Sequence, residues 1–201
     1  PAIAMKGISK EVPWPGARCG WIEVYNADKD EMFGRYIESI LNSKMVEVCS
    51  TTLPQKAIPH ILAHPEYPEY LKKRRTRYEN YSNIAYNLLT EVPGLKVNRT
   101  NGAFYMSVVF ERNVLNDKQT LPIDIPAVQT LVEKLVSQPG TLHDKRFVYY
   151  LLASTGICVV PISSFCTEER GFRITLLEQD EKEFTQIFIT IANAITTYLK
   201  S

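Results

Sequence analysis

The chain has 201 residues, of which 45% are hydrophobic and 22% are charged, and its formal net charge is +1. These proportions are typical of a globular protein and disfavour a largely disordered chain. So small a net charge offers no electrostatic basis for binding nucleic acid, and no apolar run reaches the roughly 18 residues that span a bilayer. We therefore expect neither nucleic acid nor a membrane among the partners.

Two further features concern the setting of the chain. The four cysteines are scattered without a CxxC pair, which predicts reduced thiols in a cytoplasmic protein. Residues 1–5 (Pro-Ala-Ile-Ala-Met) carry neither an initiator Met nor a helix cap, and they are typical of the middle of a buried segment. We therefore expect the chain to be a fragment of a longer protein.

The first third of the chain predicts one strand and two helices. An apolar, aromatic and β-branched run within residues 18–26 indicates the strand. Apolar residues at three-to-four spacing between 32 and 41 indicate a helix that Asp28 or Asp30 caps. A second helix is expected over about 55–63, although Pro59 lies inside it. Prolines at 65 and 68 then mark a boundary between two regions, 1–65 and 66–201.

The remainder of the chain predicts an α+β unit. The expected fold class of the chain as a whole is α/β. A long helix is expected over residues 69–91, and a strongly amphipathic final helix follows a cap at Asp180. Between them the patterns favour strands over 95–98, 102–110, 157–161 (as a buried strand) and 171–177, and helices over 125–136 and 145–153.

Candidate chemistry narrows to lysine and arginine. The chain has no phosphate-binding loop, HExxH or GxSxG motif, and its three histidines lack metal-ligand spacing. A turn rich in Gly and Pro, residues 7–21, contains Lys10 and, eight positions later, Arg18. An amine with a lowered pKa can form an imine, and a neighbouring guanidinium both favours this and binds phosphate. From the residues alone, a surface lysine beside a turn is the alternative interpretation.

Four segments together resemble the class I and II aminotransferases of fold type I. Residues 7–10 (Gly-Ile-Ser-Lys), with Gly16, Arg18 and Gly20, resemble the cofactor-attachment motif of that family. Further landmarks resemble the family in the same order: 101–105 (Asn-Gly-Ala-Phe-Tyr), 155–161 (Thr-Gly-Ile-Cys-Val-Val-Pro) and 171–175 (Gly-Phe-Arg-Ile-Thr). The alanine aminotransferase branch is most similar, and the aspartate branch is close behind.

The resemblance implies a cofactor and three site residues. Lys10 would hold pyridoxal 5'-phosphate as a Schiff base and move the proton between Cα and C4′, and Arg18 would bind the cofactor phosphate. Arg173 would pair bidentately with the substrate carboxylate, which suits a guanidinium fork. The alternative for Arg173 is a cross-strand salt bridge with a nearby Glu, such as Glu178.

The resemblance also implies an incomplete enzyme. Residues 1–65 would end the large cofactor-binding domain, and 66–201 would form the small α+β domain of a homodimer that acts on an amino acid and a 2-oxo acid. The residues that contact the cofactor ring precede the lysine in this family, so we expect this chain to be inactive alone. Three alternatives stay open. The chain could belong to a lyase or decarboxylase of the same fold, to a non-catalytic regulatory or binding domain, or to a globular domain in which Lys10 is incidental.

Three departures from the family pattern bear on the site. Gly7 stands where many relatives have a phosphate-binding serine, and residues 162–165 (Ile-Ser-Ser-Phe) replace the usual GSxF. Residues 47–49 (Glu-Val-Cys) stand where some relatives place an arginine for a second substrate carboxylate. The sequence therefore does not support dicarboxylate specificity.

Overall fold

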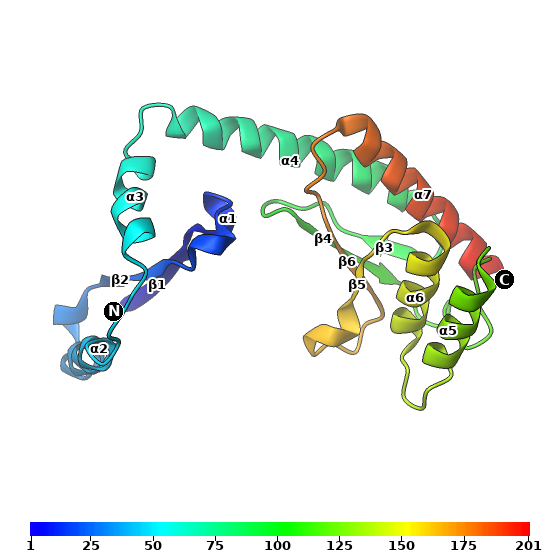
Figure 1. The fold of residues 1–201 in the computed structure, drawn as a ribbon, viewed down its shortest axis with the longest axis horizontal. Coiled ribbons are helices and arrows are strands. Elements are labelled where there is room, and N and C mark those ends of the chain that lie inside the picture. Colours follow the sequence, from blue (N-terminus) through cyan, green and yellow to red (C-terminus); the bar gives the residue numbers. More distant parts are fainter. The chain divides into compact units, whose positions relative to one another are not determined.

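The protein consists of two compact units. A computed structural model describes all 201 residues, and they divide into Pro1–Tyr70 and Leu71–Ser201 (Figure 1). None of the helices combines the length and hydropathy needed to cross a membrane. All four cysteines are free thiols, as the spacing predicted.

The first unit is built on a two-stranded antiparallel hairpin. Strands β1 (Ala2–Gly7) and β2 (Gly20–Tyr25) pair in register from Ala2 opposite Tyr25 to Gly7 opposite Gly20. Glycine is required at 20, because a Cβ there would lie 2.7 Å from the carbonyl oxygen of Lys6. Between the strands lie helix α1 (Ile8–Glu11) and a 3-10 turn, Pro15–Ala17.

Two further helices complete the first unit. Helix α2 (Glu31–Lys44) begins after Asp30, whose carboxylate accepts a hydrogen bond from the Phe33 amide at 2.8 Å. Helix α3 (Thr52–Leu62) contains Pro59, as expected. Asp30 therefore provides the cap that the sequence assigned to Asp28 or Asp30.

The core of the first unit is small. One cluster of buried side chains, Ile8, Ala17 and Ile58, joins the hairpin loop to α3. Thirteen of the chain's twenty exposed large hydrophobic side chains lie in this unit, with Met5 85% and Val48 91% exposed. The expectation that residues 1–5 are buried is therefore wrong for this chain: they form a strand of a two-stranded hairpin, and no further layer covers them.

The second unit is a four-stranded antiparallel sheet in the order β3-β4-β6-β5. Its helices are α4 (Tyr67–Thr90), which begins in the first unit, α5 (Pro126–Val136), α6 (His143–Thr155) and α7 (Glu181–Lys200). The strands are β3 (Leu95–Val97), β4 (Tyr105–Phe110), β5 (Val160–Pro161) and β6 (Gly171–Thr175).

Alternation along the two central strands separates a buried face from an open one. Met106 and Val108 of β4 and Phe172 of β6 are fully buried in the core that includes residues of α4, α6 and α7. Ser107 and Thr175 are exposed on the opposite face. One side of the sheet is therefore a hydrophobic core and the other is an accessible surface.

The buried face is rich in aromatic contacts. The ring of Phe147 from α6 lies 5.1 Å from that of Phe110, 5.7 Å from that of Phe172 and 5.2 Å from that of Tyr198, centroid to centroid. Tyr81 stacks on Phe184 at 4.2 Å, joining α4 to α7. The spacing of apolar residues predicted these helices correctly, because each turns one apolar stripe to the core.

One predicted strand is largely wrong. A buried strand was expected over 157–161, but β5 contains only Val160 and Pro161, and Cys158 and Val160 are exposed. The reason is its position: β5 is an edge strand that pairs only with β6. A continuous apolar run does not by itself distinguish a central strand from a short edge strand.

Candidate active site

The loop between β1 and β2 carries two of the three expected site residues. The amide of Ile8 donates to the carbonyl oxygen of Cys19 at 3.4 Å, which closes residues 8–19 into a loop. Ile8 and Ala17 are buried beneath it. Lys10 lies two residues after the closing amide, and Arg18 lies one residue before the accepting carbonyl.

Lys10 lies on the exposed side of α1, which is a single helical turn. The next residue, Glu11, accepts a hydrogen bond at 2.8 Å from the hydroxyl of Tyr67 at the start of α4. The amides of Val12 and Trp14 both donate to the Ile8 carbonyl oxygen, at 3.3 and 3.2 Å. These contacts hold the turn that presents the Lys10 amine.

Arg18 has an unusual backbone conformation. Its φ of 49° is left-handed, which costs a residue with a Cβ roughly 1–2 kcal/mol. One guanidinium nitrogen, Nη1, donates to the carbonyl oxygen of Pro15 at 3.0 Å, and Arg18 forms no ion pair with a carboxylate. A strained backbone that presents an unneutralised cation is a reason to expect an anionic ligand.

Arg18 also lines a groove of about 750 Å³ in the first unit. Lys6 and Lys44 contribute to the same groove, and Lys44 is paired there with Glu47. Lys10 is not part of the lining. The groove therefore adds positive charge around Arg18 without extending to the lysine.

The two side chains of this loop fit pyridoxal phosphate chemically. An amine is the group that condenses with its aldehyde, and a guanidinium is the group that binds its phosphate. Both are exposed on one closed loop, and the guanidinium is not neutralised by the protein. The donor set thus matches the two ends of this cofactor.

Arg173 lies in the second unit, on the open face of the sheet. Arg173 belongs to β6, and in the sheet it lies opposite Ser107 of β4 on one side and opposite Val160 of β5 on the other. Its guanidinium carbon Cζ lies 4.8 Å from the ring centroid of Tyr105 and 4.1 Å from that of Phe165. These distances are those of cation–π contacts, which hold the planar group while its N–H edge can still bind a carboxylate.

The alternative role for Arg173 is not observed. Arg173 forms no ion pair with Glu178, whose Oε1 accepts instead from the amides of Gln179 and Asp180, at 2.6 and 3.1 Å. The cation on the open face is therefore not neutralised by the carboxylate that the sequence offered.

Two aromatic residues beside Arg173 were missed as candidates. Tyr105 lies one diagonal step from Arg173 on the same face, so strand alternation could have predicted the contact. Phe165 lies in the 3-10 turn Ile162–Phe165, and no periodic pattern relates it to β6. Its placement depends on how the following loop closes.

The basic run over residues 72–77 of α4 is only partly a solvated helix face. Lys72, Lys73 and Arg75 are exposed, but the guanidinium carbons of Arg74 and Arg77 lie 5.6 and 5.0 Å from the ring centroid of Tyr78. Burial opposes ionisation of this phenol, but hydrogen bonds from both arginines outweigh it and lower the Tyr78 pKa. Part of the run is thus packed against the protein.

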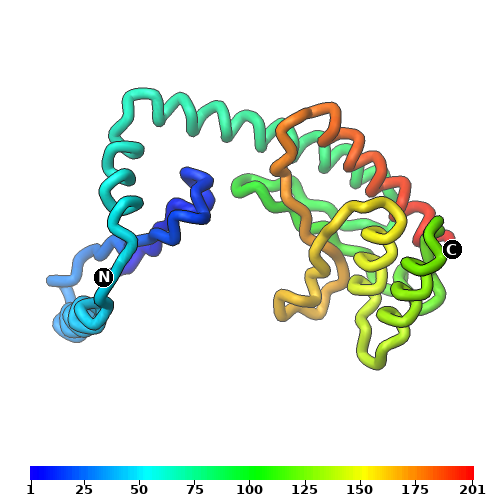
Figure 2. Tube along the Cα trace, viewed as in Figure 1, coloured from blue at the N-terminus to red at the C-terminus, as the bar shows by residue number.

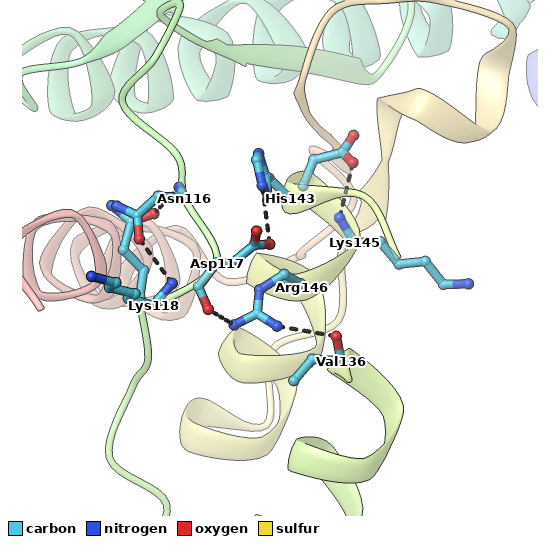
Figure 3. A network of polar contacts seen from close by, with 9 residues as sticks. Asn116, Asp117, Lys118, Val136, His143, Lys145 and Arg146 are labelled. Carbon is cyan, nitrogen blue, oxygen red and sulfur yellow. Dashed lines mark hydrogen bonds and ion pairs between the residues drawn. The ribbon is translucent and has the colours of Figure 1, made fainter. Parts of the chain in front are cut away.

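A polar network supports the beginning of α6 (Figure 3). The buried guanidinium of Arg146 donates to the carbonyl oxygens of Val136 and Asp117, at 3.1 and 2.6 Å. His143 lies 3.2 Å from the carboxylate of Asp117. The network ties α6 to the end of α5 and to the preceding loop, and it includes none of the three expected site residues.

The structure thus places Lys10 and Arg18 on the same loop of the first unit and Arg173 in the other unit. The fold is that of fold type I enzymes. The alanine aminotransferase of Pyrococcus furiosus matches 98% of this chain and 42% of its own chain, with a TM-score of 0.69 and 22% identity. A decarboxylase of Sulfurospirillum multivorans matches 95% of this chain and 43% of its own, with a TM-score of 0.62 and 13% identity.

Sequence comparison defines the family. The profile of aminotransferase class I and II matches residues 1–187, and the chain belongs to this family. An uncharacterized aminotransferase of Methanocaldococcus jannaschii is 54% identical over 199 residues, which are 99% of this chain and 46% of that relative. The chain therefore spans about half the length of this relative. The expected family and the α/β fold of part of a fold type I enzyme are confirmed.

Proposed function

We propose that this chain is the C-terminal part of an enzyme that uses pyridoxal 5'-phosphate to transfer an amino group between an amino acid and a 2-oxo acid. One observation carries the proposal. Lys10 and Arg18 share a closed loop, and no carboxylate neutralises the guanidinium of Arg18, in a chain that belongs to the aminotransferase family. The cofactor supplies an electron sink that acidifies the Cα–H bond of a bound amino acid.

Each of the three residues has a separate role in this proposal. Lys10 would hold the cofactor through its amine, and its Nζ would act as the general base that moves the proton at the substrate Cα. Arg18 binds the phosphate. Arg173 orients the substrate by a bidentate contact with its α-carboxylate, while Tyr105 and Phe165 hold the guanidinium in place.

We further propose that residues 1–65 end the cofactor-binding domain and that 66–201 form the small domain. The division into compact units five residues later, at Tyr70, supports this assignment. The chain should be inactive alone. Two observations support the proposal that the chain is inactive alone. The chain covers only 46% of the M. jannaschii relative. The first unit also exposes many apolar side chains, which is typical of a domain face that further protein covers.

The complete enzyme is proposed to be a cytoplasmic homodimer. The four free thiols support a reducing compartment. Light scattering on the full-length protein tests the dimer: a mass of two chains is expected, and a monomer at micromolar concentration would contradict it.

The decisive experiment uses full-length protein. Lys10→Ala should abolish the visible absorbance band of the lysine-bound cofactor, whereas Lys29→Ala, which removes an exposed lysine of the first unit outside the groove, should keep it. With L-alanine as the amino donor and a 2-oxo acid as the acceptor, the wild-type protein should form pyruvate and the amino acid that corresponds to the acceptor. An unchanged band in Lys10→Ala would refute the role of this lysine.

A lyase or decarboxylase is the second candidate, and the likeness of the fold to the S. multivorans decarboxylase favours keeping it. The products separate the two. A transaminase leaves a 2-oxo acid and the aminated cofactor, a decarboxylase releases carbon dioxide, and a lyase releases ammonia. Absence of any cofactor band in the wild-type protein would instead favour a non-catalytic domain.

A further inference from the structure

We propose that Asp144 is a positioning residue for Arg173, a role that rests on the proposed function. Asp144 lies in the first turn of α6 and is completely buried. It has no direct contact with Arg173. Its carboxylate instead fixes the segment of chain that leads from β5 into β6 and that contains Phe165.

The carboxylate of Asp144 holds both ends of this segment. Its Oδ2 accepts from the amide of Ser163 at 3.0 Å and lies 3.5 Å from the amide of Gly171, eight residues later. Its Oδ1 accepts from the hydroxyl of Ser163 at 2.8 Å and from the amide of Lys145 at 2.9 Å. One buried side chain thus closes residues 163–171 into a loop. Figure 2 shows the trace turning away after β5 and returning into β6.

The closed loop includes one of the two rings that contact Arg173. Phe165 lies two residues after Ser163, and its ring centroid is 4.1 Å from the Arg173 guanidinium carbon. Arg173 itself lies two residues after Gly171 in β6. Phe165 and Arg173 therefore each lie two residues after an amide that faces Asp144. The carboxylate thus determines the position of the Phe165 ring relative to the Arg173 guanidinium.

A carboxylate suits this position for physical reasons. Amides in the first turn of a helix have no partner within the helix, and negative charge is stabilised there by the helix dipole. The oxygens of Asp144 serve four donors, which offsets the cost of burying the charge. Both oxygens accept from Ser163, so the position of the 3-10 turn is held in two directions.

The test compares adjacent serines in the full-length holoenzyme. Ser163→Ala removes the hydroxyl bond to Asp144, whereas Ser164→Ala changes an exposed serine next to it. Asp144→Asn keeps the shape but replaces an acceptor oxygen by a donor. We expect Ser163→Ala and Asp144→Asn to raise the KM for L-alanine about tenfold, because Phe165 and Arg173 are then held less firmly for the substrate carboxylate. The kcat and the cofactor absorbance band should stay within about twofold of wild type, because Lys10 is untouched.

Amide hydrogen exchange supplies a readout that is independent of turnover. Exchange over residues 164–171 should be faster in Ser163→Ala than in Ser164→Ala, because the segment has lost one attachment. Equal exchange in the two variants, or faster exchange with an unchanged KM, overturns the positioning role while leaving the aminotransferase intact. A wild-type protein without the cofactor band would overturn the proposed function first, and this role with it.

Discussion

Replacing Phe172 by Ala should destabilise the second unit without altering the first. Phe172 is fully buried at the centre of β6, where its ring lies 6.2 Å from that of Phe110 and 5.7 Å from that of Phe147. Its neighbour Arg173 points to the opposite, open face. The substitution therefore removes a core ring that lies next in sequence to a proposed substrate-binding residue.

The expected loss follows from the burial of the ring. Truncating a fully buried Phe to Ala lowers the free energy of unfolding by about 3–5 kcal/mol, because apolar contact is lost and a cavity is left. With a urea dependence of about 2 kcal/mol/M for a unit of this size, the midpoint of unfolding should fall by about 2 M. Thr175→Ala, on the exposed face of the same strand, should move the midpoint by no more than about 0.3 M.

The two units can be followed separately in one sample. Both tryptophans, Trp14 and Trp21, lie in the first unit, whereas the larger part of the far-UV circular dichroism comes from the helices of the second, with α2 and α3 of the first unit adding the remainder. Phe172→Ala should shift the dichroism transition and leave the tryptophan transition in place. A shift of the dichroism midpoint below about 0.5 M would refute the core assignment of β6, because the cavity left by a buried Phe lowers the free energy of unfolding by more than that.

Three further substitutions test other parts of the second unit. Gly171→Ala should lower the free energy of unfolding by about 3 kcal/mol in urea titration, because its Cβ would overlap the carbonyl oxygen of Val108. Asp180→Ala should cost about 1 kcal/mol in the same assay, since its carboxylate caps two amides of α7 at 2.8 and 3.0 Å. Burial raises the pKa of Tyr198 to about 12 against the opposing attraction of Arg146, so stability should fall as the pH rises from about 10 to 12, where only the unfolded tyrosine is ionised. Tyr198→Phe should lack that alkaline loss, and an equal loss in both proteins would contradict the assignment.

The parts of the fold that the sequence predicted are those with a strong local period. Helix α7 follows from its apolar stripe and from Asp180, and β6 follows from a short β-branched and aromatic run. Strand β1 was not predicted because its definition depends on pairing with β2, thirteen residues further on. The extent of β5 was wrong because an edge position is a property of the sheet and not of the residues.

The candidate site shows the same division. Lys10, Arg18 and Arg173 were proposed from a resemblance in four segments, and their roles stay predictions. The contact of Tyr105 with Arg173 follows from strand alternation, so it could have been predicted from the sequence. The contributions of Phe165 and Asp144 were not, because they depend on a loop whose ends are eight residues apart and meet at one carboxylate.

The two units differ in how firmly each one holds the site residues proposed for it. The second unit buries its core with residues of four helices, and it holds the Arg173 guanidinium between two aromatic rings on the other sheet face. The first unit holds Lys10 and Arg18 over a cluster of only three buried side chains and exposes most of its other apolar residues. A loop on so small a core is stabilised mainly by whatever further surface packs against it. The cofactor binding proposed for Lys10 and Arg18 should therefore depend on further surface packed against the first unit, whereas the geometry around Arg173 is set by residues of the second unit.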